Sequence, residues 1–85
     1  MLTDVLLRQR LGGMLVRYRE RTATNRRELG GRVGVTANAI GAYERGERWP
    51  DPCTMARLVD VRAVDPVALY EPPPRKRPAR NGSRG

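Results

Sequence analysis

Histidine is absent from this sequence, and its absence limits the chemistry that the chain can perform. Histidine is the most frequent general acid or base in enzymes and the most frequent metal ligand. Cysteine occurs once, at Cys53, so the chain cannot form an internal disulfide and has no second thiolate for a zinc site. The acidic residues are scattered, with no spacing that would pair a nucleophile with a base. The sequence therefore predicts a protein that is not an enzyme and that uses neither a metal nor another cofactor.

Long hydrophobic runs are also absent. Near the N-terminus, Asp4, Arg8 and Arg10 surround a short apolar run, which is far shorter than the hydrophobic region of a signal peptide or a membrane-spanning helix. We therefore expect no contact with a membrane. A single cysteine suits a reducing compartment, so we expect a cytoplasmic protein, with Cys53 as a small buried or half-buried apolar residue.

Acidic residues are few relative to basic ones. The 85 residues include 17 Lys or Arg and 9 Asp or Glu, which gives a formal net charge of +8. Residues 72–85 hold five of the cations and no acid, and they begin with three prolines. We expect one domain at residues 1–71, followed by a disordered basic tail at residues 72–85. The charge favours a polyanionic partner, but residues 1–71 are only mildly basic, so the positions of their arginines decide the argument.

The N-terminal third of the sequence has the apolar spacing of a helix. Thr3 or Asp4 is expected to cap it, and its apolar positions recur as far as Tyr18. Gly12 and Gly13 each weaken a helix by about 1 kcal/mol relative to alanine. They indicate either a kink or the true start of the core helix, in which case the residues before them form a separate arm.

The middle of the sequence has the pattern of two short helices joined by a tight turn. Asn25 precedes the first of them, and Glu28 follows at the spacing of a capping box. Gly34 suits the left-handed conformation that ends a helix. Thr36 can then cap the next helix, which is expected at residues 37–45. The spacing predicts a helix-turn-helix.

The second of these short helices is expected to have two distinct faces. Ile40 and Tyr43 should face inward with Val35, and the small Gly30 should let the two helices approach closely. The outward positions are expected to be Ala37, Asn38, Gly41 and Ala42. This helix would therefore project a surface of small side chains.

Two further helices complete the expected fold. Apolar residues at positions 55, 58 and 59 have the spacing of one helical face. Asp65 followed by Pro66 is typical of a helix start, with the aspartate as cap and the proline at the first helical position. Trp49, in the loop before these helices, is expected to pack against the domain and not to stack on bases. We expect an all-α protein of five helices.

The segment Thr36-Ala-Asn-Ala-Ile-Gly-Ala-Tyr-Glu-Arg-Gly, followed by Pro50, resembles the helix-turn-helix domain of the lambdoid phage repressors and their bacterial Xre-type relatives. The resemblance extends over residues 11–71. It implies a five-helix, lambda-repressor-like domain that binds double-stranded DNA as a transcriptional regulator, repressor-like in action and paired as a homodimer. A further protein partner is possible, and the sequence does not identify it.

The resemblance also implies roles for individual positions. Arg26 corresponds to a residue that donates to a DNA phosphate from the start of the second helix, and Arg45 and Arg48 correspond to loop residues that touch the DNA backbone. Arg19 and Glu44 match a structural ion pair that bridges the first helix to the end of the third. The candidate DNA-binding residues are Asn25, Arg26, Thr36, Ala37, Asn38, Ala42, Arg45 and Arg48, the residues from Thr36 to Ala42 lying on the base-reading surface.

The segment from Thr36 to Tyr43 departs from that family because it contains no charged residue. The helix would then make few direct contacts with base edges. Either the helix seats deeply and contacts thymine methyl groups, or specificity comes mainly from DNA shape and the flanking arginines. Other functions for the same domain are the controller of a restriction-modification system, the antitoxin of a toxin pair, or a protein-interaction module that kept the fold without base recognition.

Overall fold

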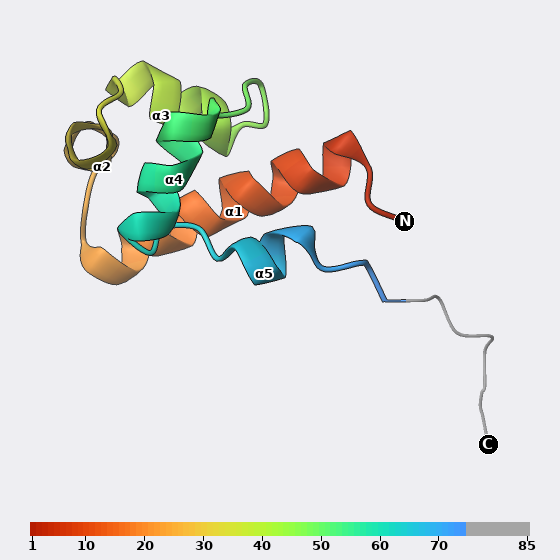
Figure 1. Ribbon diagram of the computed structural model, residues 1–85. Coiled ribbons are helices and arrows are strands. Elements are labelled where there is room, and N and C mark those ends of the chain that lie inside the picture. The colour runs from red at the N-terminus through yellow and green to blue at the C-terminus, as the bar shows by residue number, and fades with distance from the viewer. Residues whose placement is uncertain (75–85) are drawn as a thin grey trace.

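Each helix of this protein begins at a side chain that accepts a hydrogen bond from the backbone of its own first turn. The caps are Thr3, Asn25, Thr36, Asp51 and Asp65. They satisfy backbone N–H groups that have no partner inside a helix. The computed structural model describes residues 1–74 (Figure 1). Within this part it is all-helical, with α1 (Asp4–Thr22), α2 (Arg26–Val33), α3 (Ala37–Glu44), α4 (Pro52–Asp60) and α5 (Pro66–Tyr70).

Helix α1 runs without interruption through Gly12 and Gly13. The alternative of a separate N-terminal arm is therefore wrong. Thr3 is the cap, and its hydroxyl accepts from the N–H of Leu6 at 3.0 Å. Gly12 is needed for a packing reason, because it is buried where the backbone of α3 crosses α1.

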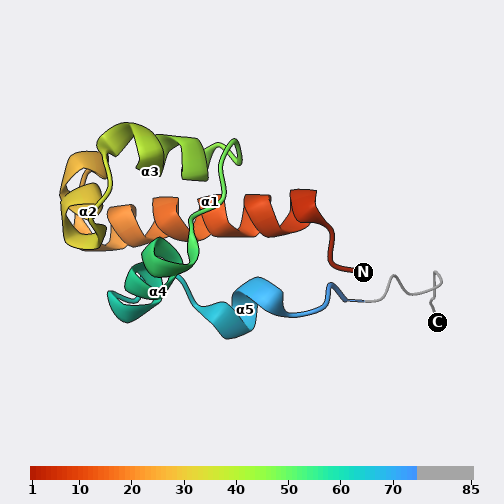
Figure 2. The same ribbon diagram turned by 45° about the horizontal axis from the view of Figure 1, so that its top comes forward.

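The core draws on all five helices. Helix α1 packs against α3 and α5, and α2 packs against α3 and α4. Figure 2 shows α3 on one side of α1 and α5 on the other. The fully buried side chains are Leu11, Leu15, Leu29, Val33, Ile40, Leu58 and Leu69, which include at least one from each helix. Fold and helix number thus agree with the expectation from the sequence.

Several arginines close the fold by donating to backbone carbonyls at chain turns. Arg10 Nη1 donates to the carbonyls of Ala68 and Leu69 at the end of α5, at 3.3 and 3.1 Å. Arg8 Nη1 donates to the carbonyl of Gly46 at 3.1 Å. Carbonyls at helix ends lack intrahelical partners, so the contacts of Arg10 stabilise the end of α5, while Arg8 holds the turn that follows α3. Part of the positive charge therefore has a structural role.

Cys53 is exposed, so the expectation that it is buried or half-buried is wrong. It lies in the first turn of α4, whose inward positions are taken by Thr54 and Leu58. Adjacent helical residues point in directions about 100° apart, so Cys53 is left on the outer side.

The chain leaves the helices after Tyr70, and Figure 1 shows residues 71–74 leading away from α5. The basic tail expected at residues 72–85 falls mostly on residues 75–85, which lie outside the described part of the chain. Within residues 1–74, none of the helices is long and apolar enough to span a membrane.

Candidate nucleic-acid interface

The turn between α2 and α3 is built around two glycines. Gly34 has a φ of +78°, and its N–H donates to the carbonyl of Gly30. A Cβ atom on Gly30 would lie 2.5 Å from the carbonyl oxygen of Val35. Gly30 thus allows the close approach expected from the sequence, but the backbone that it faces belongs to Val35 and Thr36 in the turn.

Both short helices begin at the caps expected from the sequence. Asn25 and Glu28 form a reciprocal capping box, with N–H to oxygen distances of 2.8 and 2.9 Å. The Thr36 hydroxyl accepts from the N–H of Ala39 at 3.1 Å. Helix α3 ends at Glu44, one residue before the expected end. These caps hold the N-termini of α2 and α3 in position on the same side of the domain.

The outward surface of α3 is smaller than the sequence indicates. Thr36 and Asn38 are exposed and Ala37 is half-buried, but Gly41 and Ala42 are buried. The expectation that the last two face outward is wrong. Ala42 keeps 7% of its surface, and its carbonyl accepts from the N–H of Glu47 at 2.9 Å in the turn that ends α3.

Gly41 is covered by two arginine side chains. A Cβ atom built on Gly41 would lie 2.9 Å from Arg45 Nη1 and 3.7 Å from Arg26 Cδ. The guanidinium of Arg45 and the stem of Arg26 therefore lie across the middle of α3. Long arginine side chains cover apolar surface in this way while their charged ends stay near water.

Glu44 lies at the centre of a charged cluster that joins three helices. Arg19, on α1, donates to it through Nε at 2.5 Å and through Nη2 at 3.1 Å. Arg26, on α2, donates through Nε at 2.8 Å. The Glu44 side chain is only 3% exposed, whereas that of Arg26 is 50% exposed. The cluster therefore combines a buried carboxylate with one arginine that reaches the surface.

The electrostatics of this cluster favour the ionised form of Glu44. Burial alone would raise the pKa of the Glu44 carboxyl, but hydrogen bonds from Arg19 and Arg26 outweigh it and lower that pKa below its ordinary value. The same hydrogen bond raises the pKa of Arg19. The Arg26–Glu44 contact was missed from the sequence, because residues 18 positions apart on two helices share no local spacing signal.

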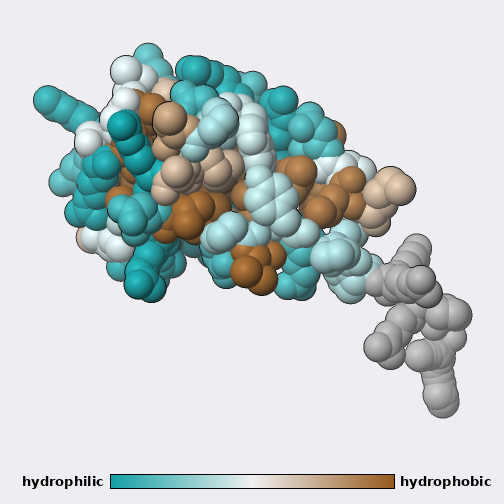
Figure 3. All heavy atoms as spheres, in the orientation of Figure 1, coloured by the Kyte–Doolittle hydropathy of each residue, from teal (hydrophilic) through white to brown (hydrophobic). Residues whose placement is uncertain are grey.

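An open groove lies between the N-terminal turns of α2 and α3. Half of its lining residues are arginines, namely Arg19, Arg26, Arg27 and Arg45, and the others are Asn25, Ala37, Asn38 and Gly41. In Figure 3, hydrophilic residues make up most of the left and upper edges of the face shown, and hydrophobic residues are exposed in its middle and towards the right. Since helix N-termini carry partial positive charge, the groove suits an anionic ligand. We call it the α2–α3 groove.

Two exposed arginines, Arg45 and Arg48, follow α3 in the chain. Arg45 is held by Glu47, with Nε–Oε2 at 3.0 Å and Nη2–Oε1 at 3.1 Å. Arg48 is exposed, and its guanidinium carbon lies 5.9 Å from the centroid of the Tyr43 ring. The sequence suggested no partner for Arg45, although Glu47 is only two positions away. Trp49 is half-buried and packs against the core.

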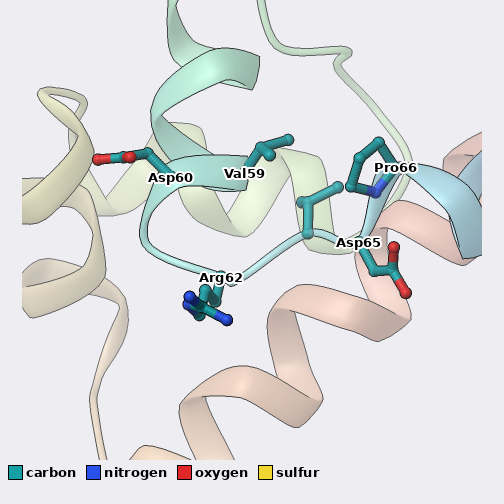
Figure 4. Close-up of a pocket in the computed structure, with 6 residues that line it drawn as sticks. Val59, Asp60, Arg62, Asp65 and Pro66 are labelled. Atoms are coloured by element: carbon teal, nitrogen blue, oxygen red, sulfur yellow. The ribbon is translucent and has the colours of Figure 1, made fainter.

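A second hollow lies between the end of α4 and the start of α5 (Figure 4). Its charged lining residues are Asp60, Arg62 and Asp65, and Figure 4 shows these side chains pointing away from one another. Sites for small ligands usually contain polar groups that converge on one point. This hollow therefore lacks the arrangement of a catalytic or ligand site.

Comparison with known proteins agrees with the geometry of α2 and α3. A family model described as a helix-turn-helix domain matches residues 10–70. No curated protein and no solved structure matches the chain. The matched segment begins at Arg10, which donates to the end of α5, and it ends at Tyr70, the last residue of α5. Since the match extends over most of the chain and includes the whole α2–α3 groove, the chain belongs to the helix-turn-helix domain family.

Proposed function

We propose that this protein is a sequence-specific regulator of transcription, related to the lambdoid phage repressors and Xre-type regulators, that binds double-stranded DNA with α3 in the major groove. The α2–α3 groove carries the proposal, because four arginines surround the N-termini of the two helices of a helix-turn-helix. A major groove about 12 Å wide admits one helix that projects from a compact support. Repression would follow from occupation of an operator.

The residues of this interface divide into two groups. Asn25 and Arg26, at the start of α2, and Arg48, in the loop after α3, are proposed to contact phosphates on the two sides of the major groove. The Nε–H group of Arg26 donates to the Glu44 carboxylate, and this leaves both Nη groups available for a phosphate. Thr36, the cap of α3, is proposed to meet base edges together with Ala37 and Asn38 in the first turn of that helix. The Asn38 amide suits the N6 and N7 edge of adenine.

The basic residues of the tail are proposed to add attraction without specificity. The domain proper is proposed to end at residue 71, and residues 72–85 carry five cations and no acid. Such a segment can neutralise neighbouring phosphates on any sequence. Base recognition is therefore assigned to the domain alone.

Substitutions in the two groups are expected to separate anchoring from base recognition. Arg48→Gln should weaken binding to every duplex and reduce the slope of log affinity against log salt by about 0.9 for each lost phosphate contact. Asn38→Ala should instead relax the preference at one base pair by about 1 to 3 kcal/mol. Fluorescence anisotropy with a selected duplex and a random duplex, at two or more salt concentrations, measures both effects.

One result of these binding measurements would contradict the proposal. If the wild-type protein binds no duplex with a salt dependence beyond that of an isolated tail peptide, residues 1–71 do not bind DNA. That result would favour a protein-interaction module. Equal losses on selected and random duplex for Asn38→Ala would remove only Asn38 from the base-reading set.

The DNA-binding species is proposed to be a twofold homodimer. A single helix of eight residues, five of them buried, reads few base pairs, and relatives with this motif pair two half-sites about one helical turn apart. The preferred site should then be roughly palindromic and hold two protomers. Analytical ultracentrifugation of the saturated complex measures the stoichiometry, and one protomer per site would contradict the dimer.

A further inference from the structure

The outer face of α3 lacks a long polar side chain of its own, but an arginine from its C-terminal end lies over it. Arg45 follows α3, and its Nη1 atom occupies the space that a side chain at Gly41 would need, 2.9 Å from where the Cβ atom would stand. Arg45 lines the α2–α3 groove together with Ala37 and Asn38. Its guanidinium therefore belongs to the surface proposed to enter the major groove, and not to the rim of that surface.

Glu47 favours one orientation of this guanidinium. Its two carboxylate oxygens accept from Arg45 Nε and Nη2 at 3.0 and 3.1 Å. This contact uses one edge of the planar fork. One N–H of Nη1 and the second N–H of Nη2 point in parallel from the end of the guanidinium, and this edge has the geometry for another pair of parallel hydrogen bonds.

We propose that Arg45, held in place by Glu47, reads a guanine in the major groove by donating to its O6 and N7 atoms. The proposal rests on the DNA-binding function above. Guanine presents two adjacent acceptors in the major groove, and arginine is the side chain that most often contacts them bidentately. Arg45 is thus a specificity-determining residue, and Glu47 is a positioning residue that acts through it.

The charge of Glu47 is the reason to assign a base, and not a phosphate, to Arg45. A carboxylate at 3.0 Å offsets the positive charge of the guanidinium and would repel a phosphate brought to the same place. The edge of a guanine is neutral overall and offers acceptors alone at O6 and N7, so the carboxylate opposes it far less. The same contact keeps the pKa of Glu47 below its ordinary value, so Glu47 stays charged at neutral pH.

Gly41 gains a function in this arrangement. Glycine weakens a helix interior relative to alanine, which is unexpected in an element that should be rigid. Because Arg45 Nη1 fills the space beside Gly41, any side chain at this position would displace the guanidinium. The bare backbone of Gly41 therefore allows the arginine to lie across α3.

The experiment begins with selection of a duplex from a random library by the full chain, followed by measurement of affinity for each single base-pair replacement. In the wild type, at least one G·C pair should be required, with a loss of about tenfold or more on replacement. Arg45→Lys keeps the charge but not the fork. It should lose far more affinity for the selected duplex than for random duplex, with the change confined to that G·C pair.

Glu47→Gln separates positioning from charge. It removes a negative charge, so it should raise affinity for random duplex while it lowers discrimination at the same G·C pair severalfold. A phosphate contact predicts a gain on both duplexes and unchanged discrimination. That result, or the same base preferences in Arg45→Lys as in the wild type, would overturn the assignment of Arg45 while leaving sequence-specific binding intact.

A pair of glycine variants provides the matched control. Gly41→Ala should lower discrimination at that G·C pair, because its methyl group displaces Arg45 Nη1. Gly31→Ala should leave it unchanged, because a Cβ atom there meets nothing within 4 Å. Equal discrimination in both variants would also contradict the inference. A wild-type protein without any base preference would overturn the inference and the proposed function together.

Discussion

Replacing Glu44 by glutamine is expected to lower the free energy of unfolding by about 3 kcal/mol at pH 7, which is the low end of the cost of breaking a buried ion pair. The Glu44 side chain is 3% exposed and accepts three hydrogen bonds from Arg19 and Arg26. Glutamine keeps the shape, but it removes the charge and turns an NH₂ group toward one guanidinium. Urea denaturation followed by circular dichroism measures the loss.

The matched control is the same replacement at Glu47. Its carboxylate also pairs with an arginine, but the two side chains are 58% and 54% exposed. Exposed ion pairs are worth about 1 kcal/mol or less, so Glu47→Gln should leave stability nearly unchanged. Similar losses in the two variants would show that burial of Glu44 does not govern the energetics of the cluster.

The difference between wild type and Glu44→Gln should depend on pH in one direction. Folding lowers the pKa of Glu44 from its ordinary value of 4.5, so the unfolded chain binds a proton more readily than the folded one. The stabilisation is therefore complete above pH 4.5 and declines as the pH falls through the lowered folded value. Unfolding curves between pH 7 and pH 2 should converge at the acid end, whereas a constant difference would contradict a depressed pKa.

Two pairs of adjacent glycines are expected to respond oppositely to alanine. In α1, a Cβ atom on Gly12 would overlap the Glu44 carbonyl oxygen and lie 3.0 Å from its carbonyl carbon. Backbone atoms cannot rotate away, so Gly12→Ala should destabilise the fold by about 2 to 3 kcal/mol through overpacking. A Cβ atom on Gly13 would meet only the flexible end of Arg17, at 3.2 Å. Gly13→Ala should be neutral or stabilising by up to about 1 kcal/mol.

The pair in α2 repeats this test at the helix-turn-helix. Gly30→Ala would place Cβ 2.5 Å from the Val35 carbonyl oxygen, whereas Gly31→Ala meets nothing within 4 Å. Thermal unfolding of the four single variants should give lower midpoints at Gly12 and Gly30 and equal or higher midpoints at Gly13 and Gly31. If alanine changes the unfolding midpoint equally at both members of a pair, the close backbone contact described for that pair is contradicted.

The sequence alone was sufficient for the helices and their ends, because these depend on neighbours along the chain. The capping box of Asn25 and Glu28 closes over three residues, and the Thr36 cap acts on the N–H of Ala39. Gly34 ends α2 because its own φ is positive. Such contacts have fixed spacings, so they can be recognised without knowledge of how the helices pack.

The candidate interface was predicted only in part, because exposure on it depends on how the helices pack and not only on neighbours along the chain. Asn38 is exposed as its position on the helix indicates, but Ala42, expected on the same outward face, is buried in the folded protein. Cys53 faces outward because Thr54 and Leu58 take the inward positions of α4. Exposure of a small residue depends on which neighbouring segment covers it, and local spacing does not contain that information.

Only the tertiary structure decided which glycines face a neighbour and where each arginine donates. Gly12 and Gly13 are equivalent in sequence, yet only Gly12 lies where the backbone of α3 crosses α1. Arg26 donates to Glu44 from another helix, and Arg45 lies over Gly41. An arginine side chain is long and flexible, so its contacts are set by the acids and carbonyls that packing brings within its reach, which the order of residues along the chain does not specify.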